Sequence, residues 1–478
     1  MIPLVLDPDR LFPPEPATRR VARALYDTVH DLPIVSPHGH TEPRWFADNA
    51  PFPDPAALFI VPDHYVFRML YSQGVPMEDL GVPLREDASG DGAEGRAQPY
   101  DARAIWRAFA SRYHLFRGTP TRLWLDHAFH DVFGVEERLT AKSADRCFDR
   151  IEACLGEDAF RPRALFERFG IEVIATTESP LDPLAHHRTI RESGWGGRVV
   201  TAYRPDPVVD PAFEGFADNV ATLGALAGED TSRWSGYLAA HRKRRAFFKT
   251  MGATSTDHGH PTANTFALDP AHCQRLLDHA LAGDITDGDA ELFRGQMLTE
   301  MAAMSQDDGL VMQIHPGSHR NHNPSVYRRF GRDKGADIPM RTSYVDALKP
   351  LLDRFGNERD FTLILFTLDE TTYARELAPL AGHYPALRLG PPWWFHDSFQ
   401  GMLRFLEQAI ETAGFYNTVG FNDDTRAFLS IPARHDVWRR VVCRFLATSV
   451  VEHRLAEDEA FELAPLLAHD LAKAAYRL

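Results

Sequence analysis

Two histidines separated by a single glycine, His38 and His40, follow a short apolar run in the stretch PIVSPHGHTEPRWF. On a β-strand, residues i and i+2 point to the same side, so both imidazoles could reach one metal ion. Gly39 would keep the backbone between them uncrowded. Histidines that meet by chance in a turn fit the same spacing, so a metal site requires a further ligand from elsewhere in the chain.

A matching carboxylate occurs far along the chain, where the segment VGFNDDTRAF carries Asp423, Asp424 and Arg426. If a barrel closes on itself, its first and last strands become neighbours, and Asp424 would then lie beside His38 and His40. Either aspartate could instead cap the helix that follows. The candidate metal ligands are therefore His38, His40 and Asp424. Two imidazoles and a carboxylate predict zinc, with manganese or iron as alternatives.

Six further residues at or near the ends of other segments could bind a ligand or move protons: His64, Tyr65, Arg204, Asp257, His315 and Trp394. The guanidinium of Arg204 could bind a carboxylate through two parallel hydrogen bonds. Trp394 could pack in the core or lie against the apolar face of a sugar. The pair His186–His187 and the residues His319 and His322 lack a third partner, so we expect them to be solvent-facing or hydrogen-bonding.

Seven apolar runs could position these groups, and they cover residues 32–40, 170–179, 197–206, 309–318, 360–370, 386–395 and 417–426. Continuous Val, Ile and Leu runs bounded by Gly and Pro are typical of strands buried on both faces. Amphipathic helices such as 345–356 and 402–414 alternate with the runs, which predicts a parallel sheet. With one strand unidentified, the pattern favours a distorted (β/α)8 barrel of the TIM type, whose reactive groups gather at the carboxyl ends of the strands. An open doubly wound sheet is the alternative, but no glycine-rich phosphate loop follows the first run.

The chain is expected to form one barrel domain over residues 1–478, with a predominantly helical insertion over residues 42–168 after the first strand. Within that insertion, residues 85–99 are polar and rich in Gly and Asp, and they predict a surface loop. The residues from Val437 onward predict closing helices.

Composition narrows the class of protein. The formal net charge of −15 argues against binding to nucleic acid or to anionic membranes. No apolar stretch is long enough to cross a bilayer, and the first residues lack the pattern of a signal peptide. The four cysteines are scattered without a CxxC pair, which indicates reduced thiols in a cytoplasmic protein. The sequence leaves a homo-oligomer open.

The ordered set of motifs resembles the uronate isomerases (glucuronate isomerases) of the amidohydrolase superfamily. The motifs are the HxH pair, DHYVFRML, TTES, AYRPD, STDHG, VMQIHPGSHRNHN, PPWWFHD and DDTRAFLSIPARHDVWRR. The resemblance implies a distorted (β/α)8 barrel that interconverts D-glucuronate with D-fructuronate and D-galacturonate with D-tagaturonate. It also implies a metal site at His38, His40 and Asp424 and a catalytic arginine at Arg426. Tyr65, Arg204, Asp257, His315 and Trp394 match positions in the substrate pocket of the family. The chain departs from the family in having DDTR where TDSR is usual, TTES where TTDD is usual, and PPWWFHD where a version with Gly and Asn is usual.

Isomerisation of an aldose to a ketose needs a base beside the C2–H bond, an electrophile at the carbonyl oxygen, and an acid that returns protons through an enediol or enediolate. Asp424 is the candidate base, Arg426 would stabilise the enediolate, and Tyr65 could carry a proton to oxygen. Arg204 is the candidate partner of the substrate carboxylate, so the pocket is expected to concentrate positive charge. Two alternatives remain: a metal-dependent hydrolase of an acidic small molecule, and a sugar-acid binding protein without catalysis.

Overall fold

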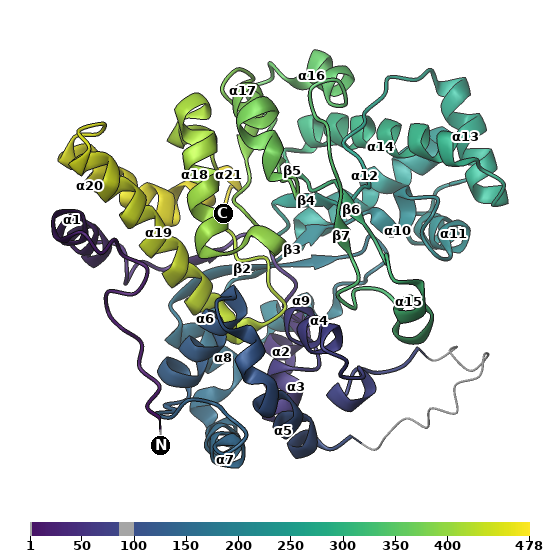
Figure 1. Ribbon diagram of the computed structural model, residues 1–478. Coiled ribbons are helices and arrows are strands. Elements are labelled where there is room, and N and C mark those ends of the chain that lie inside the picture. The colour runs from purple at the N-terminus through teal and green to yellow at the C-terminus, as the bar shows by residue number, and fades with distance from the viewer. Residues whose placement is uncertain (1, 86–99) are drawn as a thin grey trace.

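A curled sheet of seven parallel strands lies at the centre of the molecule (Figure 1). The computed structural model describes residues 2–85 and 100–478, so the loop expected over residues 85–99 lies, beyond residue 85, outside the described residues. The strands, in their spatial order, are β1 (Ile34–Ser36), β2 (Ile171–Glu178), β3 (Val199–Tyr203), β4 (Ser255–His258), β5 (Val311–Ile314), β8 (Leu363–Leu365) and β9 (Leu387–Leu389).

The strand order confirms the predicted barrel architecture. Spatial order follows chain order throughout and never reverses, whereas a doubly wound sheet has a point at which the order switches. The strand that the apolar runs did not reveal is β4. Its sequence, Ser-Thr-Asp-His, is polar, yet all four residues are buried between β3 and β5.

The predicted strand over residues 417–426 is wrong as a regular strand. This segment makes a single parallel bridge between Leu389 and Thr418. Farther along, the carbonyl oxygen of Thr425 accepts a hydrogen bond of 3.0 Å from the amide of His40. Gly420 (φ +67°) and Asp424 (φ +36°) have left-handed backbone conformations, which interrupt a strand ladder. The segment nevertheless occupies the position between β9 and the loop after β1.

Helices cover the outside of the sheet. Those that connect successive strands from β2 onward are α9 (Ala185–Glu192), α10 (Asp206–Val209), α11 (Phe216–Ala227), α12 (Trp234–Thr250), α13 (Pro270–Ala282), α14 (Asp287–Asp308), α15 (Pro324–Phe330), α16 (Lys349–Phe355) and α17 (Ala378–Ala381). The remaining helices outside the section between β1 and β2 are α1 (Pro16–Asp27), α18 (Phe399–Ala413), α19 (Ile431–Val451), α20 (Glu457–Pro465) and α21 (Leu471–Ala475). A short antiparallel pair, β6 (Ser318–His319) and β7 (Ile338–Pro339), flanks α15.

The section between β1 and β2 is helical in its described residues. Its helices are α2 (Pro43–Asp48), α3 (Pro55–Phe59), α4 (His64–Ser72), α5 (Ala102–Arg112), α6 (Pro120–His127), α7 (Ala144–Leu155) and α8 (Pro162–Arg168), and they gather at one side of the molecule (Figure 1). They share a hydrophobic cluster with Ile34 of β1 and Ile171 and Ile174 of β2, so the section packs directly on the sheet. Within the described ranges, no helix is long and apolar enough to cross a membrane.

Residues in and after α21 pack against residues of the sheet. Ala472 and the partly buried Leu478 pack against Val35, Val173 and Val200 on the inner strands. Tyr476 is fully buried beside them. Its hydroxyl donates a hydrogen bond of 2.8 Å to the side chain of Gln313 in β5. The segment after α20 therefore forms part of the floor of the barrel.

Candidate active site

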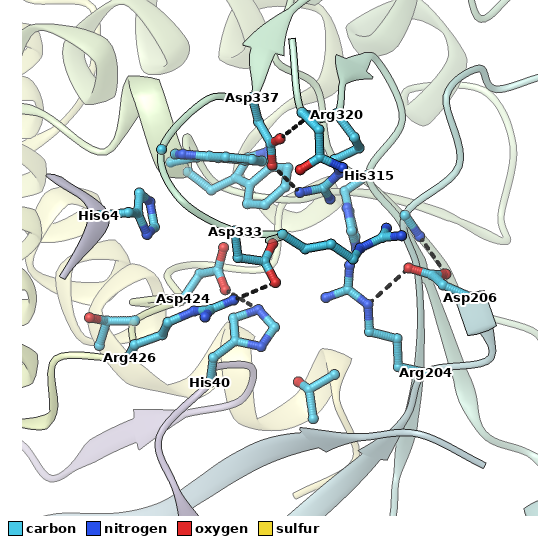
Figure 2. A pocket seen from close by; sticks show the side chains of 18 of the residues that line it. His40, His64, Arg204, Asp206, His315, Arg320, Asp333, Asp337, Asp424 and Arg426 are labelled. Carbon is cyan, nitrogen blue, oxygen red and sulfur yellow. Dashed lines mark hydrogen bonds and ion pairs between the residues drawn. The ribbon is translucent and has the colours of Figure 1, made fainter. Parts of the chain in front are cut away.

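A cavity of about 340 Å³ opens where the strands of the sheet end (Figure 2). Parallel strands bring their carboxyl ends to one edge of the sheet, so the polar residues that follow each strand meet there. Eight of the ten residues predicted from the sequence line this cavity: His40, His64, Tyr65, Arg204, His315, Trp394, Asp424 and Arg426. The other two, His38 and Asp257, are buried beneath it, with 4% and 0% of their surfaces exposed.

The three predicted metal ligands converge. The Nε2 atoms of His38 and His40 lie 3.4 Å and 3.2 Å from Oδ1 of Asp424. Two donors that bind one tetrahedral ion at about 2.0–2.1 Å lie about 3.3 Å apart, so this spacing fits a shared ion. Oδ1 of Asp424 is buried and accepts no hydrogen bond from the described protein atoms. These three residues could therefore hold a metal ion.

The protonation of this group follows from its burial and its partners. Burial alone would raise the pKa of Asp424, but His38 and His40 hold it well below its usual range. Burial lowers the pKa of His40, and Asp424 offsets that effect only in part. At His38, burial also lowers the pKa, but Asp257 and Asp424 together raise it above the usual value. Asp424 is thus ionised at neutral pH, as a ligand must be.

Asp257 connects the candidate metal ligand His38 to Arg204 and His315. Its Oδ1 lies 2.7 Å from Nε2 of His315 and 4.0 Å from Nε2 of His38. Its Oδ2 lies 3.3 Å from Nη1 of Arg204, which also donates from Nε to Asp206 at 2.9 Å. Burial would raise the pKa of Asp257, but His315, His38 and Arg204 lower it well below the usual range. Asp257 therefore orients Arg204 and His315, which line the cavity.

Gly259 makes this arrangement possible. A Cβ atom at this position would lie 2.8 Å from Asp206, 2.9 Å from Arg204 and 2.9 Å from His315, which is closer than side chains pack. Its amide also donates a hydrogen bond of 3.0 Å to Oδ1 of Asp206. Gly39, which the sequence suggested for a similar reason, differs: a Cβ atom there would meet its nearest neighbour at 3.5 Å, an ordinary contact.

The segment between β5 and β8 supplies residues that sequence reasoning missed. Asp333 pairs with Arg426 at 3.4 Å, and Asp337 accepts a hydrogen bond of 2.8 Å from Arg320 (Figure 2). The guanidinium of Arg320 lies over the ring of Trp394, 5.1 Å from its centroid. Asp333 and Asp337 do not follow an apolar run, so the pattern of strand ends in the sequence does not indicate them. Arg320 lies within the HPGSHRNHN motif, and this motif is the feature of the sequence that could have indicated Arg320 as a site residue.

The formal charge of the lining differs from the expectation. Among the described residues, six aspartates and four arginines line the cavity. The expected concentration of positive charge is therefore wrong, because carboxylates outnumber guanidiniums. A divalent cation at the His38, His40 and Asp424 group would balance that excess.

Tyr65 and His64 begin α4 and form one wall of the cavity. The carboxylate of Asp63 caps this helix by accepting a hydrogen bond of 2.8 Å from the amide of Tyr65. The rings of His64 and Tyr65 stack at 4.4 Å. Burial lowers the pKa of His64 to about 3, so its imidazole is neutral. Burial also raises the pKa of Tyr65, so its phenol keeps its proton at neutral pH.

Two histidine pairs ranked lower from the sequence do not line the cavity. His187 is buried and forms a hydrogen bond of 2.9 Å with Oγ1 of Thr176, while His186 is exposed. His319 and His322 lie with their rings 5.1 Å apart, at the β6 strand and just beyond it. Both arrangements agree with the expectation of solvent-facing or hydrogen-bonding residues.

Comparison with known proteins gives consistent results over the whole chain. A family model described as glucuronate isomerase matches residues 17–473. A uronate isomerase from Mesorhizobium japonicum is 67% identical over 472 residues, which cover 99% of this chain and 99% of that protein. A crystal structure of glucuronate isomerase from Caulobacter crescentus has a TM-score of 0.95 and 61% identity, covering 99% of this chain and 97% of that one. A uronate isomerase structure from Thermotoga maritima has a TM-score of 0.90 and 26% identity, with 99% of each chain covered.

Proposed function

This chain belongs to the glucuronate isomerase family, and on that premise we propose that it interconverts D-glucuronate with D-fructuronate and D-galacturonate with D-tagaturonate. The observation that carries the proposal is the cavity at the strand ends, where a candidate metal site, a protonated phenol and several guanidiniums face one space. The comparisons do not favour the alternative of a metal-dependent hydrolase. An enzyme of this kind would act on a small hexuronate and would bind neither nucleic acid nor a membrane.

His38, His40 and Asp424 would hold a divalent cation, for which their nitrogen and oxygen donors favour zinc. Such an ion would polarise and orient sugar oxygens. The buried Oδ1 atom of Asp424, which has no hydrogen-bond partner among the described residues, and the spacing of the donors support the assignment.

The side chains of the cavity can divide the proton transfers between them. Asp424 is the candidate base because it is ionised and can accept the C2 proton, but the two adjoining imidazoles and a bound metal would reduce its basicity. Tyr65 keeps its proton because it is buried, so it can donate to a sugar oxygen. Arg426 would stabilise the enediolate, and its ion pair with Asp333 directs its guanidinium along the cavity wall.

The substrate carboxylate is assigned to Arg204. Asp206 and Asp257 flank its guanidinium, and they fix its plane for bidentate binding. His315, His64 and Trp394 would contact the sugar from the remaining walls, while Asp257 would act on the substrate through Arg204 and His315.

The test is to incubate the protein, loaded with zinc, with D-glucuronate or D-galacturonate and to follow ketose formation by NMR. We expect both ketoses to form, and deuterium to enter C2 of recovered aldose in D₂O. Absence of ketose from both substrates would refute the isomerase proposal. Hydrolysis of lactones or amides by the same sample would then support the hydrolase.

We also propose a cytoplasmic location and a single barrel domain. The four cysteines are free and buried, as in proteins of a reducing compartment. The hydrophobic cluster shared between the helical section 42–168 and strands β1 and β2 supports one domain.

A further inference from the structure

One buried arginine outside the cavity lining connects several parts of the site. Arg434 lies near the start of α19, and 1% of its side chain is exposed. Its Nε donates a hydrogen bond of 3.0 Å to Ser430, and its Nη1 donates to the carboxylate of Asp397. Nη1 also lies 3.3 Å from the carbonyl oxygen of Asp423, the residue before Asp424. These contacts fix the plane of the guanidinium.

The face of the same guanidinium packs on two aromatic rings. Its central carbon lies 3.6 Å from the centroid of Trp124 and 5.5 Å from that of Tyr65. The rings of Tyr65 and Trp124 meet edge to face at 5.5 Å. A cation held over aromatic faces in a dry environment is attracted by their electron density, so the three groups stabilise one geometry.

The phenol of Tyr65 has few other restraints. Within residues 2–85 and 100–478, its hydroxyl makes no hydrogen bond, which leaves the oxygen free for a ligand. The position of that oxygen depends on the groups that pack against the ring, which are His64, Trp124 and Arg434. A displacement of about 1 Å at a reacting group can cost a hundredfold in rate.

From these contacts we propose that Arg434 is a positioning residue for Tyr65, holding the phenol oxygen at the place where it meets the sugar. The inference rests on the proposed function, because Tyr65 matters only if protons move in this cavity. A buried ion pair adds little stability over apolar packing of the same volume. The planar geometry of the guanidinium, which lysine lacks, explains why an arginine suits this place.

The test is a double-mutant cycle with Arg434→Lys, Tyr65→Phe and the combined variant. Lysine keeps the charge but loses the planar contact with both rings. We expect Arg434→Lys to lower kcat by about ten- to a hundredfold and to change KM by less than about threefold, because the phenol acts in the transition state. In the Tyr65→Phe background, Arg434→Lys should lower kcat by less than about twofold, because the group it positions is gone.

A matched control separates positioning from stability. Arg245 is also a fully buried arginine, paired with Asp308 through bonds of 2.7 Å and 3.0 Å, and it does not line the cavity. Arg245→Lys should lower the melting temperature while kcat stays within about twofold of the parent.

Two results would overturn the inference: an unchanged kcat in Arg434→Lys, or equal fold-losses from Arg434→Lys with and without Tyr65. If Arg434→Lys does not fold, Asp397→Asn takes its place in the cycle, because asparagine has the same shape as aspartate and removes only the charge that pairs with Arg434. Asp397→Asn must then lower kcat in the parent and have little effect on kcat in the Tyr65→Phe background. A parent protein that forms no ketose refutes the proposed function instead, so the two failures are distinguishable.

Discussion

Replacement of Glu178 by glutamine should change how the stability of the protein depends on pH. Glu178 ends β2, is buried, and accepts a hydrogen bond from Thr201. His187 lies 3.7 Å away. Burial raises the pKa of Glu178 to about 8 and lowers that of His187 to about 4. At pH 7 both side chains are therefore neutral, and the contact between them is not an ion pair.

The sign and size of the effect follow from proton linkage. A carboxyl whose pKa is higher in the folded state stabilises the fold fully below its unfolded pKa, and this contribution is lost as pH rises through the folded pKa. For Glu178 the window runs from 4.5 to about 8. At 1.36 kcal/mol per pH unit, the loss across it is at most about 5 kcal/mol. A glutamine side chain stays neutral at every pH and does not suffer this loss. Across the window, the free energy of unfolding of Glu178→Gln should therefore increase by up to that amount relative to the parent.

Thermal unfolding can measure this gain. At about 2.1 cal/mol/K per residue, the unfolding of 478 residues has an entropy of about 1 kcal/mol/K, so about 5 kcal/mol corresponds to about 5 °C. We expect the difference between the melting temperatures of Glu178→Gln and the parent to increase in favour of the variant by up to about 5 °C between pH 5 and pH 9. A gap that stays constant over this range would refute the neutral, buried carboxyl.

A second glutamate on the same strand provides a control of opposite sign. The hydrogen bond from Lys473 lowers the pKa of Glu172, and contact with His469 lowers it further, while burial opposes the shift only in part. Its contribution is present above the unfolded pKa and is lost as pH falls. Glu172→Gln should therefore be less stable than the parent at neutral pH, and the gap should close toward acid pH.

Three other predictions concern the cavity. Asp424→Asn and His40→Ala should each lower the bound metal measured by elemental analysis to a small fraction of one ion per chain, and unchanged metal content would contradict the shared site. Chelation should lower the melting temperature of the parent, because bound metal stabilises only the folded state, but should leave that of Asp424→Asn unchanged; equal shifts in both would place the metal elsewhere. Gly259→Ala should lower kcat/KM at least about tenfold, because its Cβ atom would displace Arg204, whereas Gly39→Ala should keep most activity and its metal; similar kinetics in the two variants would refute the steric argument.

The convergence of His38, His40 and Asp424 could be predicted from the sequence, because it depends on a short-range pattern and one topological rule. His38 and His40 follow a buried run, and closure of a barrel brings the distant Asp424 beside them. The rule holds even though the closing segment is not a regular strand. Left-handed conformations at Gly420 and Asp424 break the ladder, and an apolar run does not show at which residue a strand is interrupted in this way.

Other features could not be predicted in this way. β4 has only four residues, all of them polar or charged by type, so no apolar run marks it. Asp333 and Asp337 reach the cavity from a long irregular connection, where no spacing rule applies. The roles of the site residues and the assignment of residues 42–168 as an insertion stay predictions.

The floor formed by Tyr476 has a consequence for the biosynthesis of the protein. Chains are synthesised from the N-terminus, so His38 and His40 leave the ribosome long before Asp424, and Tyr476 follows later still. Tyr476 bonds Gln313 inside the barrel, so this contact can form only after the segment beyond α20 has been released. A metal ion that needs His38, His40 and Asp424 together could therefore bind only after most of the chain has been synthesised.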